Sequence, residues 1–390
     1  MNEIDRMIQE LCPDGVEFRK LGEVCEINRG TRVVRSELDA DGQYAVYQNS
    51  LIPLGYYDKF NYPEHTTFVI SAGSAGEIGY TDKPIWAADD CLCIKCPPII
   101  VDKYVFYYLK NNQHSLTSQV RRSSVPRLSR KVLEAISLPV PPMAVQRKIV
   151  EILDKFTELE AELEAELEAR RKQYEYYRNK LLTFTPPNDQ EVRWCTLGEI
   201  GTLIRGNGIQ KKDFTESGVG CIHYGQIYTH YGTSASKTLS YISPSQATRC
   251  PKAKKGDIII AITSENVEDV CKALTWLGEE EVAVSGHTAI LKHEQNPKFL
   301  AYYFQTQEFF KQKQKYAHGT KVIEISPTQI ARIIIPIPSL EKQAQIVSIL
   351  DKFEALTTSL QDGLPAEIVA HRRQYEYYRN KLLSFSRKTA

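Results

Sequence analysis

The sequence lacks an excess of charge of either sign. Lys and Arg total 49 and Asp and Glu total 48, so the formal net charge is +1. This balance excludes a generally basic coat protein, and any basic patch has to be local. No run approaches the roughly 18 apolar residues that a membrane span needs. The opening MNEIDRMIQE also lacks the apolar run of a secretory signal. We therefore expect a cytoplasmic location.

Cysteine is present in an odd number, nine, with no sign of export, which favours reduced thiols over a disulfide framework. Cys91, Cys93 and Cys96 form a C-x-C-x-x-C pattern, but a zinc site needs a fourth ligand and the nearest upstream histidine is His65. We interpret the segment as a buried strand and expect no metal site.

Motifs of catalysis are also missing. GSAGEIG at 73–79 fits neither a dinucleotide nor a phosphate loop and is better explained as a tight turn. PPND at 186–189 has the wrong order for an amino-methyltransferase motif, and the residues 189–193 only loosely imitate a nuclease carboxylate cluster. His223 and His230 do not have a metal-ligand spacing. We expect no catalytic residue in this chain.

What the sequence does contain is an internal repeat. YEYYRNKLLTF at 174–184 returns as YEYYRNKLLSF at 375–385, and QRKIVEILDKF at 146–156 returns as QAQIVSILDKF at 343–353. Upstream, LGE occurs at 21–23 and again at 197–199. The segments between these matches have little sequence similarity to each other. We call the repeated segments the frame and the two dissimilar segments the inserts.

The repeated C-terminal segments have the apolar spacing of helices. Residues 142–184 contain no internal Gly or Pro and predict one helix of about 40 residues, or roughly 60 Å. Its middle, 159–169, is a tetrapeptide repeat, LEAE-LEAE-LEA, which suits a length adjuster. In the second copy we expect a helix from Gln343 to about residue 361, a break at Gly363, and a further helix from near Pro365 to Leu383.

The two inserts predict mixed α and β structure. Residues 68–80 and 256–263 are apolar runs bounded by Gly and Ser, typical of strands, whereas 104–112 and 299–310 are typical of helices. We therefore expect an α+β chain with two mixed α/β domains, residues 1–141 and 185–338. A helical spacer, 142–184, separates them, and a second helical region with a tail, 339–390, follows.

Positive charge gathers at matched places in the two inserts. Arg121, Arg122, Arg127, Arg130 and Lys131 precede the first long helix, and a second run that includes His318 and Lys321 precedes the other. Basic loops also follow both LGE segments. A solvated face explains any single lysine, but the recurrence favours DNA, because guanidinium and ammonium groups bind phosphates and amides bind base edges.

These features together resemble the specificity subunits of type I restriction-modification enzymes. The resemblance rests on the paired LGE segments, the proline-rich entries to the helices, the I-V-x-I-L-D-K-F helices, the QYEYYRNKLL ends and the adjustable tetrapeptide. It covers essentially the whole chain. It implies two target-recognition domains and helices that pair as an antiparallel coiled coil with pseudo-twofold symmetry.

The resemblance also implies a non-catalytic subunit that recognises a bipartite, asymmetric double-stranded DNA site. It would bind two methyltransferase subunits and two restriction/motor subunits, and S-adenosylmethionine, ATP and Mg would reside on those partners. An unpartnered copy that acts only as an interaction scaffold, kept for recombination, is the alternative.

Carried over by position, the resemblance places the first half-site at 29–35, 71–76 and 121–127, and the second at 205–212, 263–266 and 318–322. The DNA-binding candidates are Arg29, Arg32, Arg35, Ser71, Ser74, Arg121, Arg122, Arg127, Arg205, Asn207, Lys211, Lys212, Ser264, Asn266, His318, Thr320 and Lys321. Gly319-Thr320 keeps the Gly-Ser or Gly-Thr pair of the family, whereas Arg122-Ser123 does not.

Helix pairing is expected from the apolar stripe. We expect the first helix to pack on the second through two sets of residues, Ile149, Leu153 and Phe156 against Ile346, Leu350 and Phe353. The tyrosines at 174, 177, 375 and 378 are either part of this core or contacts with the methyltransferase.

Overall fold

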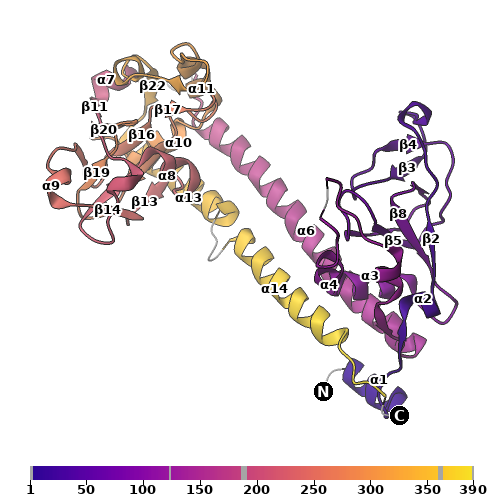
Figure 1. The fold of residues 1–390 in the computed structure, drawn as a ribbon. Helices are drawn as coiled ribbons and strands as arrows, with labels where there is room; N and C mark the ends of the chain where they lie inside the picture. Colours follow the sequence, from indigo (N-terminus) through magenta and orange to yellow (C-terminus); the bar gives the residue numbers. More distant parts are fainter. Residues whose placement is uncertain (1–2, 123, 186–190, 359–362, 389–390) are drawn as a thin grey trace. The chain divides into compact units, whose positions relative to one another are not determined.

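The computed structural model describes residues 3–122, 124–185, 191–358 and 363–388 (Figure 1). The chain forms two compact units, each of which combines a mixed α/β domain with parts of the long helices. Unit 1 contains Met1–Ala165 and Glu367–Ala390, and unit 2 contains Glu166–Ala366. The longest helix, α6 (Met143–Leu181), therefore contributes its first part to unit 1 and its last part to unit 2. The expected α+β class is confirmed.

Unit 1 is built on a four-stranded sheet, ordered β2-β8-β5-β6, a three-stranded sheet, β4-β3-β7, and a β1-β9 pair. Among the strand pairs described in this unit, β3 and β7 run parallel and the others are antiparallel. The strands are β1 (Phe18–Lys20), β2 (Glu26–Arg29), β3 (Tyr44–Tyr47), β4 (Gly55–Tyr57), β5 (Thr66–Ile70), β6 (Ile78–Thr81), β7 (Trp86–Ala87), β8 (Cys91–Lys95) and β9 (Ser137–Pro139).

Unit 2 repeats this plan with additional strands. Its sheets have the orders β11-β20-β16-β18-β13 and β14-β12-β19-β15, with the pairs β10-β22 and β17-β21. The strands are β10 (Arg193–Thr196), β11 (Gly201–Arg205), β12 (Val219–Ile222), β13 (Ser234–Ala235), β14 (Ser240–Ile242), β15 (Lys252–Ala253), β16 (Ile258–Ala261), β17 (Thr263–Ser264), β18 (Ala273–Trp276), β19 (Val282–Val284), β20 (Thr288–His293), β21 (Ile323–Glu324) and β22 (Ile334–Ile337).

The helices within the inserts are short, and the helices α6, α13 and α14, which lie outside them, are long. Besides α6 they are α1 (Glu3–Leu11), α2 (Leu21–Val24), η1 (Arg35–Glu37), α3 (Asp102–Asn111), α4 (Gln113–Thr117), α5 (Arg130–Glu134), α7 (Leu197–Ile200), η2 (Lys211–Asp213), α8 (Tyr224–Thr229), α9 (Pro244–Ala247), α10 (Pro297–Tyr303), α11 (Gln307–Gln314), α12 (Pro327–Ile330), α13 (Leu340–Thr358) and α14 (Leu364–Leu382). None of the described helices is long and apolar enough to cross a membrane.

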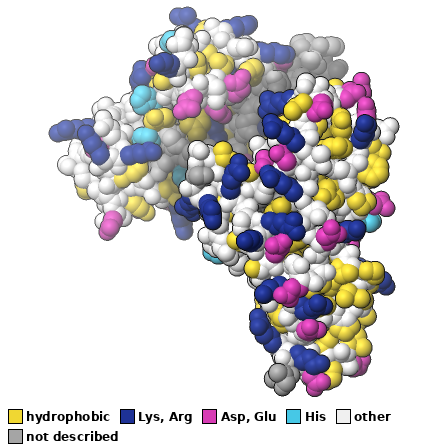
Figure 2. Space-filling model, turned by 45° about the vertical axis from the view of Figure 1, so that its right-hand side comes forward, with side chains coloured by type: hydrophobic (Ala, Val, Ile, Leu, Met, Phe, Trp, Pro, Cys, Tyr) yellow, Lys and Arg dark blue, Asp and Glu magenta, His cyan; other side chains and the backbone are white. Residues whose placement is uncertain are grey.

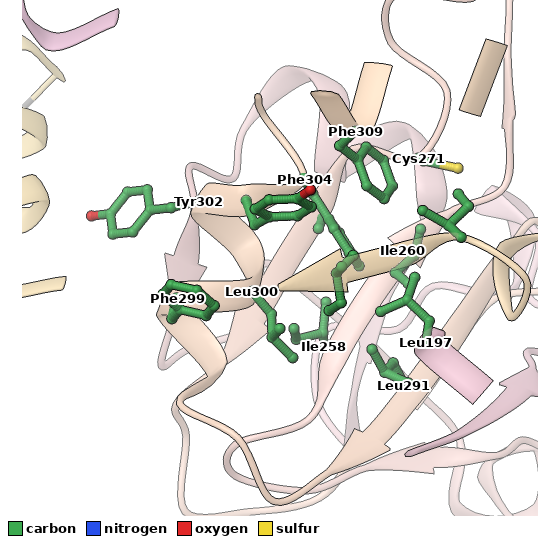
Figure 3. Packing of buried hydrophobic residues seen from close by; sticks show 14 of the residues in the cluster. Leu197, Ile258, Ile260, Cys271, Leu291, Phe299, Leu300, Tyr302, Phe304 and Phe309 are labelled. Carbon is green, nitrogen blue, oxygen red and sulfur yellow. The ribbon is translucent and has the colours of Figure 1, made fainter. Parts of the chain in front are cut away.

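The central strands are apolar throughout because both of their faces are buried. Along β16, Ile258 and Ile260 enter the main core of unit 2, while Ile259 and Ala261 enter a second cluster on the opposite face. The rings of α10 and α11 cover the first of these faces (Figure 3). Tyr302 points away from Ile258 and Ile260 in that view.

The same alternation explains the cysteine-rich strand β8. Leu92 and Ile94 lie in one core cluster of unit 1, and Cys91 and Cys93 lie in another. Burial raises the pKa of the Cys91 thiol to about 12. The expected buried strand is confirmed.

The turn and helix predictions within the inserts hold with one refinement. The tight turn joins β5 to β6 through Gly73 and Gly76, both at positive φ. The single helix expected over 299–310 is two helices, α10 and α11. Their boundary forms because the Thr306 side chain accepts a hydrogen bond from the Phe309 N–H and caps the second helix.

A buried glutamine joins each long helix to its domain, which explains one repeated motif. Gln146 is fully buried, donates from Nε2 to the Pro141 and Ile99 carbonyls, and accepts from the Val101 N–H at 2.9 Å. Gln343 does the same in unit 2, where it donates to the Pro338 carbonyl and accepts from the Asn296 N–H at 2.9 Å. The repeat therefore encodes a structural attachment.

The aspartate of the repeated LDKF motif makes a second matched attachment. In unit 1 Asp154 accepts from the Tyr107 hydroxyl at 2.5 Å and pairs with Lys103 at 2.8 Å. In unit 2 Asp351 accepts from the Tyr302 hydroxyl at 2.6 Å and pairs with Lys298 at 2.8 Å. Each long helix is thus fixed to its own domain by a tyrosine and a lysine.

Helix pairing follows a register that differs from the expected one. Ile149 and Leu153 lie in one core cluster with Leu382 and Leu383 of the C-terminal segment, and Phe156 lies 5.9 Å from the Tyr375 ring. Phe156 follows Ile149 along α6, whereas its partner Tyr375 precedes Leu382 along α14. The two helices therefore run antiparallel.

The second trio has its own partners in unit 2. Ile346 and Leu350 lie in the other main cluster, with Leu182, and Phe353 stacks 5.4 Å from Tyr177. The expectation that the two trios face each other is wrong. The reason is that the start of each repeated helix packs on the end of the other copy, where the tyrosine-rich segment supplies a matching apolar stripe.

Four tyrosines were expected either in the helix core or in contact with the methyltransferase. Tyr174, Tyr375 and Tyr378 pack against the two cores, and Tyr177 lies against Phe353, so these tyrosines are part of helix packing. The helix α13 is described as far as Thr358, and α14 begins at Leu364, directly after the predicted break at Gly363; residues 359–362 lie outside the described residues.

Candidate DNA interface

The first site is organised by an arginine at the end of β2. Arg29 donates from Nε to the Asp89 carbonyl, and its Nη2 lies 3.9 Å from Asp90 Oδ1. Gly30 follows because the chain passes very close to the β7–β8 loop. A Cβ atom at this position would lie 2.2 Å from the Ala88 carbonyl oxygen. The Arg-Gly pair thus fixes where the arginine leaves the sheet.

Three other predicted residues join Arg29 around one cavity. Ser71, Arg121 and Arg127 line it together with Arg29, and its volume is about 460 Å³. The short ladders that place them pair Ala72 with Arg127 and Arg121 with Arg127. Residues from three distant parts of the sequence therefore form a single arginine-rich concavity.

Two charged lining residues had not been predicted as site residues, Asp90 and Arg130. Burial, and then repulsion from Asp89, raises the pKa of Asp90, while Arg29 and Arg127 oppose this rise. Arg130 pairs with Glu134 one turn along α5, at 2.7 Å. The concavity therefore offers guanidinium donors and a carboxylate acceptor, the two functions needed to read base edges.

The remaining predicted residues of the first site lie outside that cavity lining. Arg32, Arg35 and Arg122 are exposed, and Ser74 is partly buried in the turn between β5 and β6, where its N–H donates to the Asn49 carbonyl at 2.9 Å. Ser123 lies outside the described residues. On the face drawn in Figure 2, basic side chains are interspersed with acidic ones, in keeping with the balanced composition.

The second site has the same strand-end arginine in a different electrostatic setting. Arg205 ends β11, donates from Nε to the Gly286 carbonyl at 3.4 Å, and pairs through Nη2 with Glu324 Oε1 at 2.9 Å. Gly206 follows, and a Cβ there would lie 2.0 Å from the Ser285 carbonyl oxygen. The sequence had not predicted Glu324 as a site residue.

Two further predicted residues meet at Glu324. His318 forms a short antiparallel ladder with Glu324, and Ser264 pairs with the neighbouring Ile323 in the β17–β21 ladder. Gly319 adopts a φ of +113°, and a Cβ at that position would lie 2.0 Å from the Val322 carbonyl oxygen. This requirement explains the glycine of the Gly319-Thr320 pair.

The other predicted residues of the second site are spread more widely. Asn207 lines a separate cavity of about 500 Å³ with Arg249 and donates to the carbonyl of that residue at 3.0 Å. Asn266 donates to Asp269 Oδ2 at 2.9 Å. Lys211 and Lys212 lie in η2, and Thr320 and Lys321 lie beside Gly319; all four are exposed.

The two histidines considered as alternatives make ordinary structural contacts. His223 caps α8 by accepting from the Gly225 N–H at 3.2 Å, and His230 is the C-cap residue of the same helix. The described residues hold no group of three or more His, Cys, Asp or Glu side chains that could bind a metal ion. The PPND segment, 186–189, lies outside the described residues.

The family model of the type I restriction modification DNA specificity domain matches the chain twice, over residues 13–169 and 190–370. The chain belongs to the type I restriction-modification specificity subunits. This is a non-catalytic family whose members supply the DNA specificity of the enzyme, so the chain is the specificity component of such a system.

Individual relatives agree over nearly the full length. A Haemophilus influenzae protein assigned to the type I restriction enzyme specificity subunits is 30% identical, with 95% of this chain and 96% of that protein covered. The Escherichia coli EcoR124I/EcoR124II specificity subunit is 29% identical, with 99% and 98% covered.

Two solved structures show the same fold. The specificity subunit from M. genitalium has a TM-score of 0.58 and 19% identity and covers 95% of this chain and 96% of its own. A chain from a study of complex assembly in the type I restriction-modification system has a TM-score of 0.61 and 15% identity, with 95% and 97% covered.

Proposed function

We propose that this specificity subunit recognises a bipartite, asymmetric double-stranded DNA sequence, with one half-site read by each unit. The observation that carries the proposal is the pair of strand-end arginines, Arg29 and Arg205. Each is followed by a glycine that no other residue can replace without a clash, and each stands beside a carboxylate. The frames are alike and the surrounding side chains differ, which is what an asymmetric site requires.

The predicted DNA-binding residues fall into two chemical roles in this proposal. Exposed side chains outside the first cavity and on η2, such as Arg32, Arg122 and Lys212, neutralise phosphates and set the position of the duplex. Side chains gathered at the two sites, such as Arg127 and His318, reach base edges in the major groove.

The helices have a separate role. We assign target recognition to residues 1–141 and 185–338, and spacing to the helical regions 142–184 and 339–390. The attachments made by Gln146 and Asp154 in unit 1, and by Gln343 and Asp351 in unit 2, fix each domain to a helix. The length of helix between the domains then determines the gap between half-sites.

Duplicated surface residues support the binding of two copies of one partner. Tyr176 and Tyr377 occupy the same place in the two YEYYRNKLL segments, and their exposed fractions are 59% and 62%. Their neighbours Tyr177 and Tyr378 are taken up by helix packing. An exposed tyrosine present twice suits a docking site present twice.

These two sites would bind two methyltransferase subunits, and the full assembly would add two restriction/motor subunits. S-adenosylmethionine, ATP and Mg would be held by those partners. The whole assembly would act in the cytoplasm.

The test uses the full chain co-expressed with the methyltransferase subunit of its own system. The purified complex is used to select sequences from random duplexes, and the best duplex is footprinted. We expect co-purification and two short protected tracts separated by an unprotected gap. One uninterrupted tract would refute recognition by two units, and a chain that neither co-purifies nor selects DNA would be the unpartnered scaffold.

A further inference from the structure

Two loops, one in each unit, are closed by the same pattern of backbone hydrogen bonds. Arg121 and Arg127 exchange both backbone bonds, at 2.9 and 3.2 Å, and His318 and Glu324 exchange both at 3.2 and 2.9 Å. Each pair thus brackets a loop of five residues between the same two donors and acceptors.

The residue after each loop anchors it to the central sheet. The Leu128 N–H donates to the Ser71 carbonyl at 2.8 Å, and the Ile325 N–H donates to the Ile262 carbonyl at 3.0 Å. Both anchoring side chains are buried, with exposed fractions of 4% and 0%. Positions 127 and 324 are therefore held at the same place in the two frames by backbone contacts that do not depend on their own side chains.

The strand-end glycines complete the correspondence. Gly30 donates to the Cys91 carbonyl at 3.0 Å and Gly206 to the Thr288 carbonyl at 2.9 Å. Position 127 lines the cavity next to Arg29, and position 324 pairs with Arg205. The matched position thus lies beside the strand-end arginine in both units.

The side chains at the matched position have opposite charge. Arg127 is an exposed cation, whereas Glu324 is an anion whose side chain is 33% exposed. A carboxylate in an interface with DNA is repelled by phosphates, so it is tolerated where it accepts a hydrogen bond from a base amino group. Arginine at the same place donates to the acceptors of guanine.

We propose that the residue at this matched position selects one base in each half-site: Arg127 selects guanine in the first, and Glu324 selects cytosine, through its N4 amino group, in the second. This inference rests on the proposed function, because it presupposes that the units read DNA. It adds a specificity-determining residue to each unit. In this proposal the backbone of each unit positions the residue, and the side chain at that position selects the base.

The test maps methylation on a plasmid library of random sequence, using the full chain with its methyltransferase subunit. The variants are Arg127→Gln, which removes the charge and the guanidinium fork, and Glu324→Gln, which keeps the size of the side chain but replaces one acceptor oxygen by an NH2 donor. We expect Arg127→Gln to lower the preference for guanine at one position of the first half-site by at least about 10-fold, with the second half-site unchanged. Glu324→Gln should do the same for cytosine in the second half-site alone.

Three kinds of methylation pattern overturn the inference. The first is a wild-type preference other than guanine or cytosine at the affected positions. The second is a change in the wrong half-site. The third is an equal loss of methylation at every sequence, complete loss included, because that pattern indicates a phosphate contact.

Melting curves identify a variant that fails to fold, and Arg127→Lys or Glu324→Asp then replaces it under the same criteria. A folded variant that keeps the wild-type specificity also overturns the inference, whereas a wild-type complex that methylates no specific sequence overturns the proposed function itself.

Discussion

Removing one tetrapeptide, residues 159–162, from α6 should shorten the gap between half-sites and leave both half-sites intact. Four residues of helix correspond to about 6 Å of rise and a rotation of about 40° beyond a full turn. One base pair of DNA corresponds to about 3.4 Å and roughly 35°. The gap should therefore shorten by one to two base pairs.

The structure shows why this deletion should be tolerated. Arg372 of α14 pairs with Glu160 at 2.6 Å and with Glu164 at 2.5 Å. After the deletion, Glu164 and Glu168 move into these two places, so both ion pairs can form again. Leu163 likewise replaces Leu159 in the apolar sequence pattern.

The assay is methylation mapping of the wild-type chain, the deletion and a matched insertion of one LEAE unit, each with the methyltransferase subunit. The insertion should lengthen the gap by the same amount as the deletion shortens it. Melting temperatures should stay close to that of the wild type. A change in half-site sequence, or a gap that stays the same in both variants, would refute the spacing role of the helix.

Three further predictions concern stability and binding. Leu350→Ala, at a fully buried position, should lower the free energy of unfolding by about 2–5 kcal/mol, whereas Ile349→Ala, 43% exposed on the same helix, should change it by less than about 0.5 kcal/mol in urea titrations. His293, whose pKa burial lowers to about 4, stays neutral in the fold while the unfolded chain binds a proton below its ordinary value of 6.5; stability should therefore rise with pH between about 4 and 6.5, by up to about 3 kcal/mol, and the part of this slope due to His293 should vanish in His293→Gln. Lys212→Ala should weaken DNA binding equally for all sequences and reduce the log–log salt slope by about 1 in titrations of the complex, and a sequence-dependent loss would contradict its assignment to phosphate.

The long helices could be predicted from the sequence because their segments occur as an internal repeat. The absence of Gly and Pro between Pro142 and Phe184 and the presence of Gly363 in the second copy placed the long helices, and apolar runs placed strands such as β16. The partner of each helix could not be predicted in this way. The stripes that contain Leu153 and Leu350 match each other as well as they match the tyrosine segments, so tertiary packing decides between them.

The basic residues of the two sites were predicted from the sequence, whereas their acidic neighbours were not. Arg29 and Arg127 stand in visible clusters of positive charge, whereas Asp90 is brought to them by the β8 strand from a distant part of the sequence. Glu324 did carry a signal, because it stands 197 residues after Arg127, the same spacing that separates Gln146 from Gln343. A charge reversal at a matched position is visible only when the two copies are compared residue by residue.

The central claim is that two independent recognition units share one duplicated frame, and an exchange of a single insert tests it most directly. Residues 201–333 would be replaced by the corresponding segment of the Escherichia coli relative, with the LGE segment and all long helices kept. Methylation mapping should show a new second half-site next to the original first half-site and the original gap. A new sequence in both half-sites, or an altered gap, would contradict the account.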